Sequence, residues 1–435
     1  MKIIFLRYLL FGFQFLASIL ILEKLSVYEI YIFGVFQTLL GTLLYAQFGL
    51  PQYFTKVNIN YKSELKLNKS LNIFQGAQSA ITIILFPIVT IISYYLSKSI
   101  LLAFLISINF SLISLFNIFG SYFRIKNNIK FWLLTLNFYT VAVVLYLTLI
   151  PSPKLVHLLY VISTINILLF LTFCKRTSLK IKSFKFFSII NKSIIQLVMN
   201  LGAPFLIIIN RYLALAGSEL DFKIYHEVFI VLMAAGLVVN SISQILSVKI
   251  LKLISNGETN EQKFIADNLL FTIIFVTILG YLISFLLTFK YANLFTENII
   301  VYYCFIMPSL VILFYNYLIA KNKELFSLIP LFLSLVPYLF DLSYGPFIYL
   351  VISMIIYSIS FVSLIYFFND SSSKNITYLT LRNILISGSL VLLLYYLELK
   401  SYFLVLFILI IFRKRVLIYF LNFYRFYKKD DTFYV

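Results

Sequence analysis

Long runs of apolar residues, separated by short polar segments, recur along the whole chain. A helix that crosses about 30 Å of hydrocarbon needs roughly 20 mainly apolar residues, and the runs fit fourteen such helices. The predicted ranges are 3–22, 29–49, 71–96, 100–122, 131–150, 155–173, 194–215, 225–250, 265–289, 298–320, 325–340, 347–368, 383–399 and 401–412. The pattern therefore predicts an all-α polytopic membrane protein with 12 core transmembrane helices and a further C-terminal helix pair.

Composition excludes the soluble classes. Hydrophobic residues make up 62% of the chain and charged residues 12%, whereas soluble domains average about 45–50% and about 25%. A secreted disulfide scaffold, a nucleic-acid-binding domain and an ordinary soluble enzyme are all excluded. The two cysteines, Cys174 and Cys304, are too few for a disulfide framework and lack metal-ligand spacing.

The placement of basic residues predicts the orientation, because short loops rich in Lys and Arg stay in the cytoplasm. With the N-terminus inside, 28 of the 35 basic residues fall in inner segments and six in outer loops, and Arg211 lies inside a span. Both termini are thus expected in the cytoplasm, and the net charge of +19 becomes a topology signal and an attraction to anionic membrane lipids. No nucleic-acid partner is implied. The segment 1–22 has no small-residue cleavage site before Leu25, which favours an uncleaved first helix over a signal peptide.

The first six predicted helices, shifted by 194 residues, fall on helices seven to twelve. Ile30-Tyr31 matches Ile224-Tyr225 at this offset, and Lys126-Asn127 matches Lys321-Asn322 at 195. Such a parallel repeat is typical of transporters that bind substrate between two halves, although a duplicated bundle without transport is the alternative. The predicted division has four parts. They are an N-terminal six-helix lobe over 1–174, a basic cytoplasmic linker over 175–193, a C-terminal six-helix lobe over 194–368, and an extra helix pair with a basic cytoplasmic tail over 369–435.

Two stretches resemble a known family. The segment 25–31, LSVYEIY, leads the second helix and Phe48-Gly49-Leu50 ends it, and the segment 209–213, INRYL, is followed by Ile224-Tyr225. This pattern resembles the Wzx-type polysaccharide flippases of the multidrug/oligosaccharidyl-lipid/polysaccharide exporter superfamily. Ile30 stands where that family often has Gly, and Asn210 where it often has Asp.

The resemblance implies a flippase in the bacterial cytoplasmic (inner) membrane that moves a polyprenyl-diphosphate-linked oligosaccharide, such as an O-antigen unit of lipopolysaccharide or another surface polysaccharide. Its partners would be this glycan, membrane lipids and polysaccharide polymerase machinery. The cargo's diphosphate needs cations at membrane depth, and Arg suits phosphate through bidentate hydrogen bonds. The candidate substrate-binding residues are Arg211 with Asn210, Arg7 and Arg124. Arg7 could instead reach the interface, and Arg124 could be a topology charge.

Three titratable residues are candidates for coupling to an ion gradient. His226 and Glu227 stand at the outer start of span eight, and Asp267 opens span nine on the inner side. Either site could take up a proton or a sodium ion, and histidine is the side chain whose ordinary pKa lies near physiological pH. The alternative is that these side chains face interfacial water. No cofactor other than a proton or sodium gradient is expected, and no metal site.

Two other functions share features with this chain. A multidrug or other small-solute exporter would have the same fold but would need acidic residues deep in the first lobe, where only Glu23 and Glu29 occur, at the outer edge of its spans. A membrane polysaccharide polymerase would need a sizeable outer loop, which the predicted topology lacks. No P-loop or catalytic constellation is present, so the chain is expected to be a transporter rather than an enzyme.

Topology reporters fused along the chain test the orientation. Fusions at 58, 126 and 183 should report the cytoplasm, and fusions at 152 and 220 the outside, because basic inner loops are retained in the cytoplasm. A cytoplasmic signal at 152 together with an outside signal at 183 would contradict the orientation.

Overall fold

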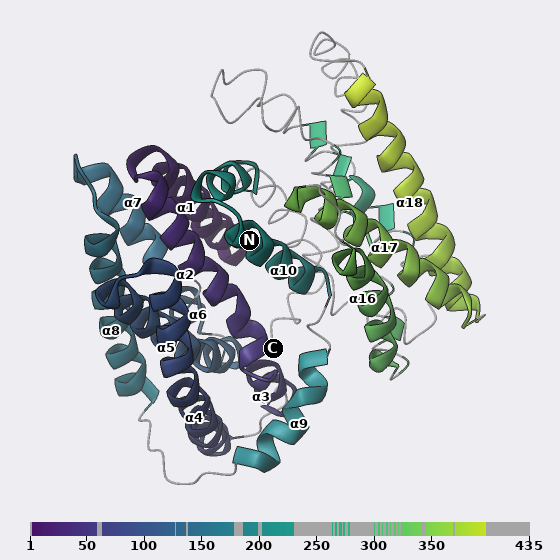
Figure 1. The fold of residues 1–435 in the computed structure, drawn as a ribbon. Coiled ribbons are helices and arrows are strands. Elements are labelled where there is room, and N and C mark those ends of the chain that lie inside the picture. Colours follow the sequence, from purple (N-terminus) through teal and green to yellow (C-terminus); the bar gives the residue numbers. More distant parts are fainter. Residues whose placement is uncertain are drawn as a thin grey trace. The chain divides into compact units, whose positions relative to one another are not determined.

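The computed structural model describes residues 2–229, except 59–62, 127, 136–137, 178–185 and 199–201; scattered residues from 263 to 321; and residues 323–396, except 341–344 and 369. Predicted span 401–412 and the predicted tail lie outside these residues, as do most of 225–250, 265–289 and 298–320. The described chain is built of helices (Figure 1). Helices α4, α5, α8, α17 and α18 are long and apolar enough to cross a membrane, so the chain is an all-α multi-pass membrane protein.

The chain divides into two compact units. The first comprises residues 1–201 and 211–224, and the second 202–210 and 225–434. The helices up to the division are α1 (Lys2–Lys24), α2 (Val27–Ala46), α3 (Leu50–Asn58), α4 (Glu64–Ser97), α5 (Ile100–Ile125), α6 (Ile129–Leu134), α7 (Tyr139–Leu149), α8 (Leu155–Thr177), α9 (Phe186–Val198) and α10 (Ala203–Ala216). Within the described part of the second unit, the later helices are α16 (Leu328–Leu335), α17 (Pro346–Tyr366) and α18 (Ser371–Tyr396). Short 3-10 turns at Glu324–Ser327 and Val336–Leu339 flank α16. The predicted lobe boundaries stay a prediction.

Several predicted spans differ from the helices that form. Helix α4 begins at Glu64 rather than 71, because Ser63 caps it by accepting a hydrogen bond from the Lys66 N–H at 3.3 Å. The span predicted at 131–150 is two helices, α6 and α7. Thr135 lies between them, and its hydroxyl donates to the Trp132 carbonyl at 2.6 Å, a local bond that competes with the helical pattern.

The span predicted at 194–215 is interrupted as well. Helix α9 ends at Val198 and α10 begins at Ala203, with Pro204 at a first-turn position where its missing N–H does no harm. The second half of the predicted linker thus forms α9. Helix α9 packs on the short helix α3, which forms inside a predicted inner loop.

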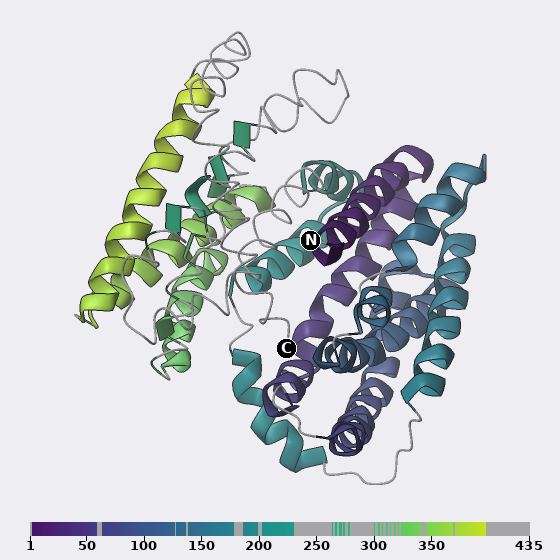
Figure 2. The same ribbon diagram turned by 180° about the vertical axis from the view of Figure 1, so that it is seen from behind.

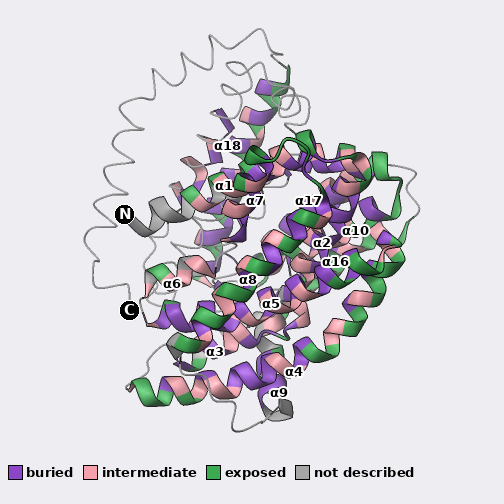
Figure 3. Ribbon diagram, turned by 90° about the vertical axis from the view of Figure 1, so that its left-hand side faces the viewer, coloured by how far each residue is buried: buried purple, intermediate pink, exposed green. Residues whose placement is uncertain are grey.

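An aromatic core holds the α3 end of the first unit together. Phe119, Phe123 and Phe173 are almost fully buried, and their ring centroids lie 5.4–6.4 Å apart. The side chains of Ile189 and Ile190 on α9 close the same cluster, which makes α9 part of this core. Figure 2 shows the same helices from behind, and Figure 3 shows that buried and exposed positions alternate along the long ones.

Two capping boxes stand 192 positions apart in the sequence. At the start of α2, Glu29 Oε2 accepts from the Ser26 N–H at 3.1 Å, and the Glu29 N–H donates to Ser26 Oγ at 3.4 Å. At the start of the helix over 219–229, Asp221 and Ser218 make the same exchange at 3.2 and 3.1 Å. Hydrogen bonds from Ser218 lower the pKa of the Asp221 carboxyl. Each box satisfies backbone donors that the first helical turn leaves over.

The predicted echo at offset 195 also has a structural counterpart. The Lys126 ammonium lies 5.4 Å from the Tyr122 ring centroid and pairs with Glu64. The Lys321 ammonium lies 5.9 Å from the Tyr317 ring centroid and pairs with Asp370. Lys126 and Lys321 thus each lie near the ring of the tyrosine four residues earlier and pair with a carboxylate from another segment.

Glu29 carries more than its own cap, which gives a stability prediction. Its Oε1 accepts from the Leu155 N–H at 2.8 Å, so one carboxylate serves the first turns of both α2 and α8. Glu29→Ala should lower the free energy of unfolding by about 1–3 kcal/mol, since each cap contributes roughly 0.5–2 kcal/mol. Thermal unfolding of the purified protein in detergent measures this.

Asp221→Ala is the matched control, because Asp221 serves the equivalent box and only that helix. Its effect on the unfolding midpoint should be clearly smaller than that of Glu29→Ala. Equal shifts for the two variants would mean that the bond to α8 contributes nothing.

Candidate functional site

The candidate site centres on α10, where two polar residues interrupt an apolar helix. Asn210 and Arg211 are neighbours near the middle of the sequence APFLIIINRYLALA. Adjacent residues on a helix point about 100° apart, and these two have different partners. Asn210 is grouped with the second unit and Arg211 with the first.

Arg211 is half-buried and bonded to α2. Its Nη2 donates to Gln37 Oε1 at 3.0 Å. The acceptor is an amide, so α2 holds the guanidinium in place without neutralising its charge. An Arg at span depth is costly unless it faces a wet cavity, an anion or a polar partner.

The same face of α2 packs closely on the segment 211–224. Tyr31, Gly34 and Gln37 are spaced three residues apart, so they share one side of the helix. The Tyr31 hydroxyl donates to the Leu215 carbonyl at 3.1 Å, and its ring meets the Phe222 ring edge-on at 5.8 Å. A Cβ at Gly34 would stand 2.1 Å from the Phe222 ring, so only glycine permits this approach. Gly34 therefore lets the segment that carries Phe222 pack closely on the same side of α2 as Gln37.

Asn210 has a packing role in the second unit. It is fully buried, and its Nδ2 donates to the backbone carbonyl of Pro346 at the start of α17. The Tyr338 hydroxyl lies beside it and beside Ser353. An ionised aspartate could not donate this bond, which is a physical reason for an asparagine at this position.

The other two predicted arginines lie elsewhere. Arg124 is in the last turn of α5 and is exposed. Arg7 lies in α1, but its side chain is outside the described residues. The described structure therefore brings neither of them to Arg211.

The ion-coupling candidates occupy two settings. His226 is buried and Glu227 half-buried in the helix over 219–229, one turn or more beyond the Ser218 cap. Asp267 is paired with Arg382 of α18. Sequence reasoning did not single out Arg382. Its position directly before predicted span 383–399 is a signal that could have found it. Among the described residues, no group of three His, Cys, Asp or Glu side chains could hold a metal ion.

Comparison with known proteins gives no sequence match: no family model matches the chain, and neither does any curated protein. Solved structures do match. The MATE multidrug transporter DinF-BH superposes with a TM-score of 0.56 at 15% identity, over 86% of this chain and 94% of that one. The lipid II flippase MurJ, in an inward closed conformation, gives 0.55 at 15% identity, over 94% of this chain and 100% of that one.

The chain has the fold of these two proteins. Because the match covers most of each chain, the likeness concerns the whole succession of helices rather than one helix pair. The predicted all-α multi-pass class is confirmed at this level. The predicted helix total is not decided by the similarity.

The Arg211–Gln37 bond predicts energetic coupling between α2 and α10. Gln37→Leu should destabilise the purified protein in detergent, because the guanidinium loses a neutral acceptor in an apolar setting. The same change in an Arg211→Met background should cost less, with a coupling energy of roughly 0.5–2 kcal/mol. Identical effects in both backgrounds would mean that the two side chains do not interact.

Proposed function

We propose that this protein is a flippase that moves a polyprenyl-diphosphate-linked oligosaccharide across the cytoplasmic membrane by alternating access. In this proposal both termini are cytoplasmic, and the cargo is a unit of O-antigen or another surface polysaccharide. The cargo's sugars would reach the outer face with the diphosphate still attached to the lipid. The protein would supply binding groups and motion but no chemistry.

The observation that carries the proposal is the distribution of charge. Within residues 1–174 the acidic residues are Glu23, Glu29 and Glu64, and all three stand at helix ends. Glu29 is engaged in helix caps and Glu64 in an ion pair. Arg211 differs in position, because it lies within an apolar helix rather than at a helix end. A cation at this depth suits a diphosphate, which accepts bidentate hydrogen bonds from a guanidinium.

The fold similarity supports the same class. One structural neighbour is named a lipid II flippase, and its alignment with this chain leaves out little of either. The sequence pattern of α2 and α10 resembles polysaccharide flippases independently of that similarity. Together they favour a lipid-linked glycan over a soluble solute.

A multidrug exporter is the second candidate, because DinF-BH is named a multidrug transporter and gives a similar TM-score. Cationic drugs need carboxylates at span depth, and residues 1–174 have none there. Transport in either case would draw on a proton or sodium gradient. The candidates for the coupling group are His226, Glu227 and Asp267, of which Asp267 already has a partner in Arg382. Polysaccharide polymerase machinery would be a partner of a flippase and not of a drug exporter.

Arg211 variants test the proposal in cells whose surface glycan depends on this protein. Arg211→Ala should reduce the glycan roughly tenfold or more, since a charge-assisted hydrogen bond contributes about 1.5–3 kcal/mol. Arg211→Lys should restore part of it, because lysine keeps the charge and loses the bidentate geometry. Immunoblots establish that each variant reaches normal abundance.

Two further variants sharpen the result. Lys130→Gln, which removes an exposed cation at the start of α6, should leave the glycan unchanged. Gln37→Glu should preserve abundance but impair transport, because a carboxylate beside Arg211 would compete with an anionic cargo. Wild-type glycan in the Arg211→Ala strain, or resistance to cationic drugs that depends on the protein, would refute the flippase proposal.

A further inference from the structure

Helix α18 carries a buried polar stripe, although it begins beyond the predicted six-helix lobes. Ser373, Thr377, Thr380, Asn383 and Ser387 recur at intervals of three or four residues, and each is at least 95% buried. Exposed apolar residues occupy other faces, namely Tyr378, Leu381, Leu385, Ile386, Leu392 and Leu393. Membrane helices associate through small and polar residues, so the stripe is the face by which α18 docks on the second unit.

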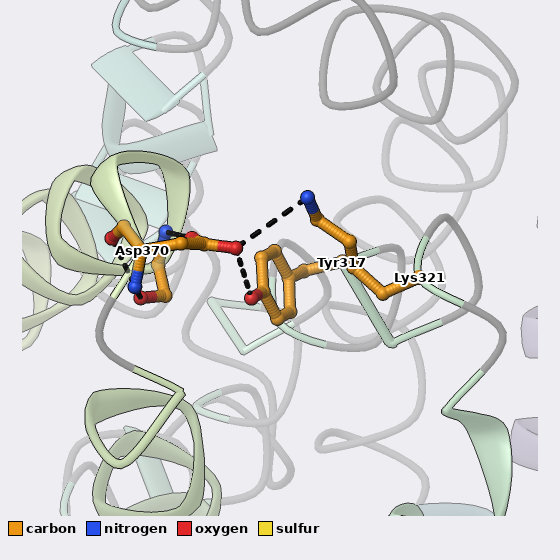
Figure 4. A network of polar contacts seen from close by, with 4 residues as sticks. Tyr317, Lys321 and Asp370 are labelled. Atoms are coloured by element: carbon orange, nitrogen blue, oxygen red, sulfur yellow. Dashed lines mark hydrogen bonds and ion pairs between the residues drawn. The ribbon is translucent and has the colours of Figure 1, made fainter.

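The first set of contacts lies at the start of α18 (Figure 4). Asp370 Oδ2 accepts from the Tyr317 hydroxyl at 2.7 Å and pairs with the Lys321 ammonium at 3.4 Å. Its Oδ1 accepts from the Ser373 N–H at 2.6 Å. Burial alone would raise the pKa of the Asp370 carboxyl, but the bonds from Ser373, Tyr317 and Lys321 outweigh it and lower that pKa. The carboxylate thus caps α18 and joins it to the segment 317–321.

The second set lies about three turns further along, where Arg382 forms an ion pair with Asp267. Both side chains are mostly buried, with 22% and 26% of their surfaces exposed. Asn383 reinforces the pair: its Oδ1 accepts from Arg382 Nη2 at 2.9 Å, and its Nδ2 donates to the Ala266 carbonyl at 2.9 Å. Arg382 therefore binds the side chain of Asp267, and Asn383 binds the backbone carbonyl of Ala266.

The third set lies one turn beyond. The Tyr303 hydroxyl donates to the Ile384 carbonyl at 2.9 Å and lies 3.0 Å from Ser387 Oγ. Successive levels of α18 are in this way bonded to three different parts of the second unit.

We propose that Asp267 and Arg382 form a tether that fixes α18 to the second unit, and that Asp267 is not the carboxylate that takes up a coupling ion. A charged group among apolar helices is costly by itself, and the pair offsets part of that penalty for both partners. Arg382 occupies the side of Asp267 with a permanent positive charge, which disfavours the arrival of a second cation. The part of this inference that concerns ion coupling rests on the proposed function; the tether does not.

Charge-neutral and charge-swapped variants of the full-length protein test the tether. Arg382→Gln alone should lower the unfolding midpoint in detergent on the order of 5 °C or more, because it leaves a mostly buried carboxylate without its cation. Asp267→Asn combined with Arg382→Gln, and Asp267→Arg combined with Arg382→Asp, should each recover at least about half of that loss. Lys374→Gln removes an exposed cation from the same helix and should leave the midpoint unchanged.

Transport in cells is the second readout. If Asp267 serves only the tether, the surface glycan should follow the unfolding midpoint, and the double-neutral variant should retain transport. A stable double-neutral protein without transport would overturn the inference, since it would identify Asp267 as an ion acceptor. An unchanged midpoint in Arg382→Gln would overturn the tether. A wild-type protein on which no glycan depends would refute the proposed function instead, and the midpoints would still decide the tether.

Discussion

A polar group that enters the apolar part of this protein is costly unless it finds a partner within the protein. In water a broken hydrogen bond is replaced by solvent, but among membrane helices the alternative is an unsatisfied group in hydrocarbon. This constraint explains why α2, α10 and α18 are joined to their neighbours by side-chain bonds as well as by apolar packing. It also explains why so many of those bonds end on backbone carbonyls, as at Leu215, Pro346 and Ala266. A backbone carbonyl that already accepts a hydrogen bond within its helix has a second lone pair, so it can also accept from a side chain of a neighbouring helix.

The constraint also separates two uses of charge. Most described carboxylates stand at helix ends. There Glu29 and Asp221 accept from backbone N–H groups, Glu64 pairs with a lysine, and Asp370 does both. Asp267 lies within a helical segment and is matched by Arg382. In each case a local partner accounts for the charge, and the structural role follows from the contact. The first unit therefore holds its helices in place largely through their ends and an aromatic core.

The sequence predicts the class of this protein well and the breaks within its helices poorly. Hydropathy depends on the sum of about twenty residues, so the long runs that become α5, α8 and α17 are evident. The break between α6 and α7 is confined to a few residues around Thr135, and so short a feature has no signature in a window average. The early start of α18 was missed because Ser371, Ser372 and Ser373 are polar, yet Asp370 makes them a capped first turn. Among site residues, Arg211 was evident because it interrupts an apolar run. Its partner Gln37 is one of many amide side chains in the predicted spans, and only the folded structure shows which of them accepts from Arg211.

Amides take the places where a second charge would defeat the purpose of the first. At position 210 a side chain must donate to the Pro346 carbonyl, and asparagine can do so while an ionised aspartate cannot. At position 37 a side chain must accept from Arg211, and glutamine does this without cancelling the positive charge of Arg211. A glutamate there would give a stronger bond and would place a negative charge beside Arg211. Helix α2 therefore holds the guanidinium through a neutral amide rather than through a carboxylate.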